Sequence, residues 1–450
     1  MITNYGNNFK RKLSGGERTM LMLPLNVVMV AKIRGPVDIT KIGAVLDKLR
    51  NRHALLSARI IFDKSNVAWY VSKNVPEIPI KIIQRNESDQ WVQTAKEEYK
   101  TTFPINTGPL LRFSLLHGSD KSELVICAHH AICDGISITY LIRDFLKLLN
   151  TPGQEIDLLP APPSINNETV PSPPSYGFIA KMIMGLMNRI WSKKKIKFSS
   201  SDLDNLHSAY WSKNKDINIL SWALSQSDTT ALVSRCRDNN VTVNTALWTA
   251  FLAAQHDILG GTKPYRSTAG LAVSIRDRLN EPVGEGFGFY ASSMTVNLKH
   301  DSKKKFWDMA KIMHRKIMNS LAKTNPFGML VADLLHPTLI DSLYFSKYGL
   351  MSSRMSDKLL KKMMWDKMSY GYAITNVGNM TIPVRYGQLQ LESIYGPFVY
   401  SDVNEKTVGI ITIGGKMTFT VAYNKVNISS IAMQKLKEDA MARLTQAIDL

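Results

Sequence analysis

The spacing of apolar positions in the first third of the chain changes repeatedly between that of strands and that of helices. Residues 20–33 carry many β-branched side chains, which favours a strand. Residues 38–52 repeat apolar positions with helical spacing, and Asp38 is suited to cap that helix. Further strands are expected at 55–62, 68–71, 110–116 and 124–128, and a further helix at 90–99. This mixture predicts an α/β or α+β fold.

The second half of the chain repeats a similar order of elements. A strand at 217–225 precedes two helical patterns, 227–239 and 242–259, and the chain closes with an amphipathic helix at 430–448. The strands expected between these helices are 267–274, 290–297, 370–376, 388–393, 408–414 and 416–423. Because this order loosely echoes that of the first half, we expect two similar lobes.

A proline-rich stretch separates the two halves. Seven prolines occur between positions 152 and 174, and few apolar residues accompany them, which is typical of a linker. The sequence therefore predicts an N-terminal lobe over 1–160, a crossover linker over 161–205 and a C-terminal lobe over 206–450. Within the linker, residues 176–198 are first apolar and then strongly basic. They are interpreted either as a surface helix with a solvated basic end or as a contact with a membrane surface or a lipid-like substrate.

Charge and cysteine content narrow the classes of partner and compartment. Lys and Arg number 56 against 37 Asp and Glu, and the formal net charge of +19 favours acidic partners. No zinc-finger, RNA-recognition or homeodomain pattern accompanies it, so no nucleic-acid partner is expected. The three cysteines are widely spaced, which indicates neither a disulfide framework nor a metal site. With no signal peptide and no apolar stretch long enough to span a membrane, we expect a soluble, cytoplasmic protein.

One short motif carries the chemistry. An apolar strand over 124–128 runs directly into His129 and His130, and a turn with Asp134 and Gly135 leads into a helix over 136–149. Polar, titratable residues at the end of a buried strand are costly unless they have a function. Neighbouring residues on a strand point to opposite faces, so one histidine can face a cleft while the other packs inward. A metal ion shared by the two is therefore not expected.

His129-His130-Ala-Ile-Cys-Asp134-Gly135 resembles the HHxxxDG signature of the acyltransferase superfamily that includes chloramphenicol acetyltransferase. That superfamily also contains the condensation domains of peptide synthetases and the alcohol and polyketide-associated acyltransferases. Weaker matches to other segments of the family occur along the chain in the expected order, one before the motif at 52–59 and three after it at 275–278, 284–290 and 375–378. The chain lacks the DFGWG segment of the plant BAHD branch, which argues against that branch.

The resemblance implies two chloramphenicol-acetyltransferase-like lobes that form a V, with the active site in a tunnel between them. His130 matches the general base, and His129 and Gly135 belong to the motif that supports it. Asp134 matches a structural aspartate that pairs with an arginine, for which Arg59 and Arg276 are the two candidates. Candidates for the oxyanion donors or the tunnel lining are Tyr290, Ser292, Ser293 and Asn376.

The function that follows from the resemblance is acyl transfer from a thioester to an alcohol. The thioester, acyl-CoA or acyl-phosphopantetheine on an acidic carrier protein, would be a co-substrate, and no bound cofactor is expected. Two alternatives stay open: a free-standing condensation enzyme that forms an amide, and a non-catalytic module that binds a carrier or lipid. Because both lobes come from one chain, the protein is expected to act as a monomer.

Overall fold

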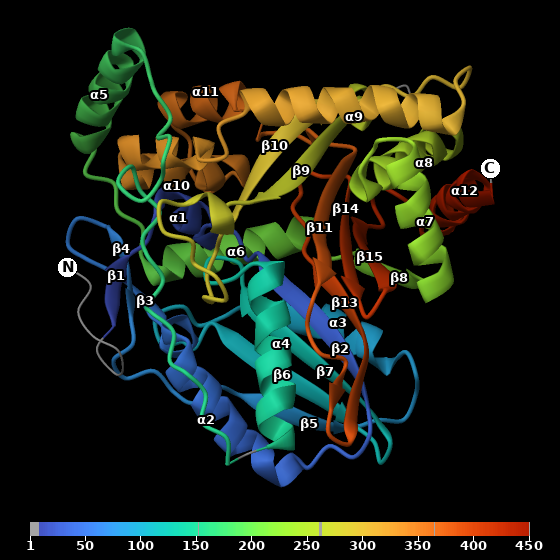
Figure 1. The fold of residues 1–450 in the computed structure, drawn as a ribbon. Helices are drawn as coiled ribbons and strands as arrows, with labels where there is room; N and C mark the ends of the chain where they lie inside the picture. Colours follow the sequence, from blue (N-terminus) through green and yellow to red (C-terminus); the bar gives the residue numbers. More distant parts are fainter. Residues whose placement is uncertain (1–8, 152, 261–262, 364, 450) are drawn as a thin grey trace.

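The computed structural model describes residues 9–151, 153–260, 263–363 and 365–449. Within them the chain forms two six-stranded mixed sheets and one small three-stranded sheet, with helices packed around them (Figure 1). The small sheet has the order β1-β4-β3, from β1 (Lys10–Lys12), β3 (Arg59–Phe62) and β4 (Ala68–Val71). None of the helices in the described ranges combines the length and the apolar content needed to cross a membrane.

The first large sheet positions the histidine motif. Its strand order is β12-β13-β2-β7-β6-β5, and β7 pairs antiparallel with β2 and β6. The strands are β2 (Asn26–Arg34), β5 (Ile80–Gln84), β6 (Leu111–His117), β7 (Lys121–His129), β12 (Arg385–Tyr386) and β13 (Leu389–Phe398). The helices packed in this half are α2 (Ile42–Arg52), α3 (Gln90–Lys100) and α4 (Gly135–Asn150). All but the first residue of β7 are buried, as expected for a central strand.

The second large sheet has the order β10-β9-β11-β14-β15-β8. Its strands are β8 (Ile217–Leu224), β9 (Thr268–Ser274), β10 (Ala291–Asn297), β11 (Tyr372–Met380), β14 (Lys406–Ile413) and β15 (Lys416–Asn424). Four helices that contact one another lie beside it: α7 (Gln226–Asp238), α8 (Val243–Leu259), α9 (Phe306–Lys323) and α12 (Ser430–Asp449) (Figure 1). This sheet and these helices bury a second hydrophobic core.

The chain crosses from the second sheet, after β11, into the first sheet, where β12 and β13 form a hairpin, and returns to the second sheet at β14. β12 and β13 come late in the sequence, yet β13 pairs antiparallel with β2 of the first sheet. The lobe boundaries expected at residues 160 and 205 stay a prediction. The pairing of β13 with β2 shows in addition that residues 385–398 belong to the first sheet. The remaining helices are α1 (Gly15–Leu21), α5 (Phe178–Ser192), α6 (Ser200–Lys213), α10 (Pro337–Lys347) and α11 (Arg354–Lys362).

Two predicted strands begin later than expected. Residues 20–21 end α1 instead of starting a strand, because Ser14 and Glu17 form a capping box that begins a helix at Gly15. The strand expected over 55–62 is a short 3-10 helix at first and becomes β3 only at Arg59. Both are cases in which local capping or turn chemistry outweighs apolar content.

Candidate active site

The histidine motif occupies the junction between β7 and α4. Hydrogen bonds from both neighbouring segments fix its backbone: His129 N donates to Leu110 O (2.9 Å), and His130 N donates to Leu25 O (2.8 Å). Five residues, 130–134, connect the strand to Gly135, where α4 begins. The junction is therefore held by the sheet on one side and by the helix on the other.

His130 is oriented by its own loop. Its Nδ1 lies 2.9 Å from the carbonyl oxygen of Cys133. Because a carbonyl only accepts, Nδ1 carries the hydrogen and Nε2 carries the lone pair. The ring is half-buried and meets Phe289 edge-on, with 5.2 Å between ring centroids. Burial lowers the pKa of His130 below its ordinary 6.5, so the imidazole is neutral at pH 7.

His129 has a different environment from its neighbour. It is buried (2% exposed), and its Nδ1 accepts a hydrogen bond from Ala131 N at 3.2 Å. Burial, with a smaller contribution from nearby His207, lowers the pKa of His129 to about 3. His129 therefore stays neutral and packs inside the lobe, and its half-buried neighbour is the more accessible of the two imidazoles.

Asp134 holds the second half of the chain against the motif. Its carboxylate accepts from Arg276 Nη2 at 2.9 Å and, as the N-cap of α4, from Ser137 N at 2.7 Å. The other carboxylate oxygen accepts from Tyr290 N at 3.3 Å. Asp134 and Arg276 are both buried, and each of the aspartate's oxygens has a donor. This arrangement describes a structural ion pair rather than a proton carrier.

Arg276 and Tyr290 lie on the loop between β9 and β10. The Arg276 guanidinium also donates to the carbonyls of Gly284 and Gly286, both at 2.9 Å, and lies 4.7 Å from the Tyr290 ring centre. Tyr290 is itself buried, and no described residue hydrogen-bonds its hydroxyl. The sequence suggests Tyr290 as an oxyanion donor or as part of the tunnel lining. The structure places its ring under the Arg276 guanidinium, next to the motif.

Arg59 has to be removed from the motif's support. Its guanidinium donates to the carbonyls of Lys73 (2.9 Å) and Asn106 (3.1 Å) instead of to Asp134. The physical reason is its position on β3, in the small sheet, whereas Arg276 lies on the loop that reaches the start of α4. Both arginines lie in segments that resemble the family, and sequence alone could not choose between them.

A second ion-pair contact between the β9–β10 loop and α4 could not be recognised from the sequence. Glu285 accepts from Arg143 Nη2 (2.6 Å) and from Arg52 Nη2 (3.0 Å), and Arg52 also donates to the buried Asp144 (2.9 Å). Arg143 and Asp144 lie on α4, so the β9–β10 loop is attached to that helix at two points. The sequence carries a partial signal for this contact, because Arg52 lies in the segment 52–59 that resembles the family.

Gly135 allows the second half of the chain to approach α4 closely. A Cβ at this position would lie 2.9 Å from Val377 Cγ2 and 3.2 Å from Pro397 Cγ. Val377 is on β11 of the second sheet and Pro397 on the crossing strand β13. A glycine in the motif thus keeps three elements in contact beside His130.

The remaining candidates are placed as follows. Ser292 lines a cavity of about 30 Å³ with Phe289, the ring that contacts His130, and that volume suits a water molecule. Ser293 is exposed on the opposite face of β10. The Asn376 side-chain oxygen accepts from Gly378 N at 2.9 Å, which leaves its NH₂ as the donor toward other groups. All three stay candidates.

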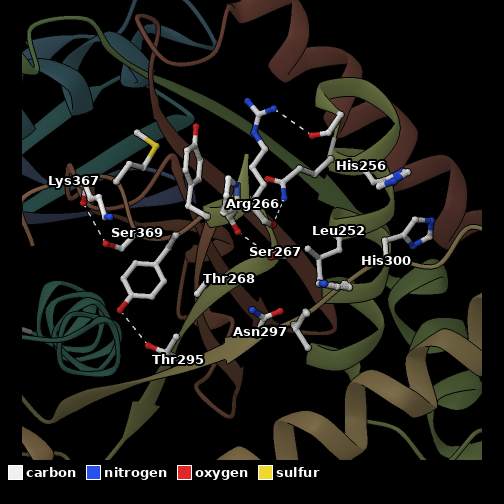
Figure 2. A pocket seen from close by; sticks show the side chains of 18 residues that line it. Leu252, His256, Arg266, Ser267, Thr268, Thr295, Asn297, His300, Lys367 and Ser369 are labelled. Carbon is white, nitrogen blue, oxygen red and sulfur yellow. Dashed lines mark hydrogen bonds between the residues drawn. The ribbon is translucent and has the colours of Figure 1, made fainter. Parts of the chain in front are cut away.

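Another cavity lies elsewhere in the second lobe. It has a volume of about 780 Å³, and Figure 2 shows Thr268 and Asn297 among its lining residues. These two residues pair at one end of the β9–β10 ladder, and Ser274 pairs with Ala291 at the other end, next to Arg276. The cavity is therefore separated from the histidine motif by the length of these strands.

A cluster beside this cavity has metal-ligand chemistry. Ligand atoms of His256, Asp257 and His300 lie within 4.8 Å of one another, and both imidazoles line the cavity (Figure 2). However, Asp257 Oδ2 is 2.5 Å from Arg443 Nη2. With that carboxylate paired, two imidazoles remain, fewer than the three or four protein ligands of zinc sites. We assign no metal to this cluster.

Comparison with known proteins extends the sequence resemblance. Residues 25–166 match the condensation domain family. A plipastatin synthase protein of Bacillus subtilis (strain 168) is 28% identical over 125 residues, which are 27% of this chain and 5% of that protein. The chain thus spans about one-twentieth of that relative's length.

Solved structures cover nearly the whole chain. The TRI3 trichothecene 15-O-acetyltransferase of Fusarium sporotrichioides has a TM-score of 0.65 at 13% identity, over 99% of this chain and 97% of that one. The first condensation domain of the CDA synthetase has a TM-score of 0.65 at 12% identity, again over 99% and 97%. Together with the family match, these likenesses confirm the resemblance to the acyltransferase and condensation superfamily and the two-lobed α/β fold. The tunnel between the lobes stays a prediction.

Proposed function

We propose that the protein is an acyltransferase that moves an acyl group from a thioester to a hydroxyl or amine, with His130 as general base. The observation that carries this proposal is the Nδ1 hydrogen bond of His130 to the Cys133 carbonyl. It leaves a neutral imidazole whose Nε2 can take a proton, which a purely binding module has no need for.

The His130 imidazole can carry out both proton transfers of this reaction. As the acceptor oxygen or nitrogen attacks the thioester carbonyl, its proton passes to His130 Nε2 and a new C–O or C–N bond forms. When the tetrahedral intermediate collapses, the C–S bond breaks and the thiolate leaves with the proton from the imidazolium. Ser292 and the Asn376 amide are the candidate donors to the oxyanion.

The donor is proposed to be a carrier-bound phosphopantetheine thioester. The match of residues 25–166 to condensation domains supports this choice over coenzyme A, and the net charge of +19 suits an acidic carrier protein. The acceptor is proposed to be an alcohol, which gives an ester. A free-standing condensation reaction that gives an amide is the alternative, and it uses the same base.

The test measures thiol release from an acyl-carrier protein and, separately, from acyl-CoA, in the presence of a mixture of alcohols or of amines. We expect turnover by the wild type, and a loss of about 10²- to 10⁴-fold in His130→Ala. His256→Ala is the matched control, because this exposed histidine lies beside the remote cavity. Mass spectrometry of the product separates ester from amide.

Two outcomes would contradict the proposal. If folded His130→Ala releases thiol as fast as the wild type, His130 is not the base. If neither donor supports turnover with any acceptor, while the wild type binds the acyl-carrier protein with the same affinity as His130→Ala does, the protein is the non-catalytic module.

A further inference from the structure

Helix α5 carries an unusual concentration of exposed apolar side chains. Thirteen large hydrophobic residues are exposed in the described part of the chain, and six of them lie on this one helix. They are Phe178, Ile179, Met182, Ile183, Leu186 and Ile190, with exposed fractions from 44% to 81%. Single exposed apolar residues are ordinary, but a contiguous group of this kind marks an interaction surface.

These six residues form a single face of the helix. Phe178, Met182, Leu186 and Ile190 follow one another at intervals of four, and Ile179 and Ile183 lie beside them. Figure 1 shows α5 standing away from the body of the molecule. The face is therefore a convex ridge directed outward, which we call the α5 ridge.

The other side of α5 is fixed to the protein. Trp191 is fully buried, and its Nε1 donates to Thr338 Oγ1 at 2.9 Å. The Asn188 side chain donates to Leu334 O (2.8 Å) and accepts from His336 N (2.7 Å). These contacts anchor the C-terminal part of the helix to α10 and the segment before it, so the ridge is held in place rather than loosely attached.

The charge around the ridge is mostly basic, although the acidic residues Asp333 and Asp357 lie on segments that contact α5 or its C-terminal end. From residue 169 to residue 201 the chain contains six basic residues and no acidic one. Lys193, Lys194 and Lys195 follow directly after the helix and are exposed. Lys194 Nζ donates to Ser353 Oγ at 3.0 Å, which brings the start of α11 alongside, and α11 adds the exposed Lys358, Lys361 and Lys362.

From this surface we propose that the α5 ridge docks the protein onto a membrane surface that contains anionic lipid. An apolar helix face with a basic margin is the chemistry of helices that lie in the headgroup region, where apolar side chains enter the acyl boundary and Lys or Arg pair with phosphates. A convex ridge enters a fluid bilayer without needing a complementary groove. The proposal does not depend on His130 and goes beyond the proposed acyl transfer.

The test is flotation of the full chain with vesicles of phosphatidylcholine that contain about one-third phosphatidylserine. We expect the wild type to float with these vesicles, and to float several-fold less with phosphatidylcholine alone or when NaCl is raised from about 0.1 M to about 0.5 M. The double variant Phe178→Glu/Leu186→Glu should lose about tenfold in bound fraction, because carboxylates cannot enter the acyl boundary.

Two further variants make the outcome specific. Val426→Glu/Ile431→Glu is the matched control: both residues are 73% exposed and lie next to or on α12, so binding should be retained. Lys193→Glu/Lys195→Glu should weaken binding at low salt only. Because all these positions are exposed, we expect the variants to fold, which circular dichroism checks.

The proposal fails if the wild type does not float with anionic vesicles, or if Phe178→Glu/Leu186→Glu floats equally well. It also fails if the wild type is a dimer by light scattering that this variant converts to a monomer, with no vesicle binding by either. In that case the ridge is a contact between two copies of the chain. Binding by His130→Ala should equal that of the wild type, which keeps this result independent of catalysis.

Discussion

The junctions β7–α4 and β15–α12 have the same plan and different chemistry. Each strand pairs antiparallel with both neighbours, and five residues separate strand and helix, 130–134 in one and 425–429 in the other. In the second lobe, Asn424 makes the turn by accepting from Val426 N at 3.0 Å, and Ser429 Oγ accepts from Ala432 N near the start of α12. No imidazole or ion pair is involved there.

The comparison shows what the fold itself requires at such a junction. A turn residue and a cap are enough to connect a buried strand to a helix. The first junction adds two imidazoles with lowered pKa values and a buried aspartate paired with Arg276. Buried polar and charged groups cost free energy, so their presence at one junction and absence from the other supports a chemical role for the first.

The largest stability difference between the junctions should come from the two helix caps. Asp134→Asn keeps an N-cap residue but removes the charge that faces Arg276, and we expect a loss of about 3–5 kcal/mol in the free energy of unfolding. Ser429→Ala, at the other cap, should cost about 1 kcal/mol. Urea unfolding measures both. A loss below about 1 kcal/mol in Asp134→Asn would show that the ion pair does not hold the halves together.

The next largest difference between the junctions should be in how the free energy of unfolding depends on pH. The pKa of His129 is lowered to about 3 in the folded protein, so only the unfolded state takes up this proton between pH 6.5 and pH 3. Stability is therefore lost as the pH falls, by about 2 kcal/mol at pH 5 from this residue. In His129→Gln the loss between pH 7 and pH 5 should be smaller by that amount. An unchanged loss would mean that His129 titrates normally.

A smaller effect is expected from the first residue of each helix. Gly135→Ala places a Cβ against Val377 and Pro397, which costs about 1–3 kcal/mol, while the alanine favours the helix by roughly 1 kcal/mol. We expect a net loss of about 1 kcal/mol by thermal unfolding. Ser430→Ala, at the exposed start of α12, removes one hydrogen bond from the Tyr423 hydroxyl (3.1 Å) and creates no close contact, so it should cost only about 0.5 kcal/mol. Equal stability losses in Gly135→Ala and Ser430→Ala would show that the close contact at Gly135 does not contribute.

The smallest expected effect is in the pH profile of activity. A histidine of pKa 6.5 is only about one-quarter neutral at pH 6.0. Because burial lowers the pKa of His130, more of the base form remains, and the acid limb of kcat should have an apparent pKa below 6.5. Initial rates from pH 5 to pH 8 measure it. An apparent pKa above 6.5 would contradict the environment described for His130.

Local signals predicted much of this fold. The helix over 242–259 begins after its Thr242 cap, as expected, and 68–71 is β4 without correction. The motif His129–Gly135 is recognisable in the sequence because all its residues lie in one short stretch. In each case the information is contained in neighbouring positions along the chain.

Features that depend on distant residues could not be predicted. The choice of Arg276 over Arg59 depends on which loop reaches α4, and the sequence does not contain that distance. The same holds for Glu285, whose partners Arg52 and Arg143 lie more than a hundred positions away. For residues 176–198 the helix was expected, but only the structure shows which of its faces remains open.

The hairpin β12–β13 also affects the order in which the protein can assemble. Until residues 389–398 leave the ribosome, β2 has no partner on one side, and its unpaired backbone groups form an open sheet edge. The edge of the first sheet therefore stays unpaired during synthesis until a segment more than three hundred residues later is made. During that time other chains can pair with it. Production of residues 1–205 alone should give insoluble material, even though that piece contains the whole histidine motif.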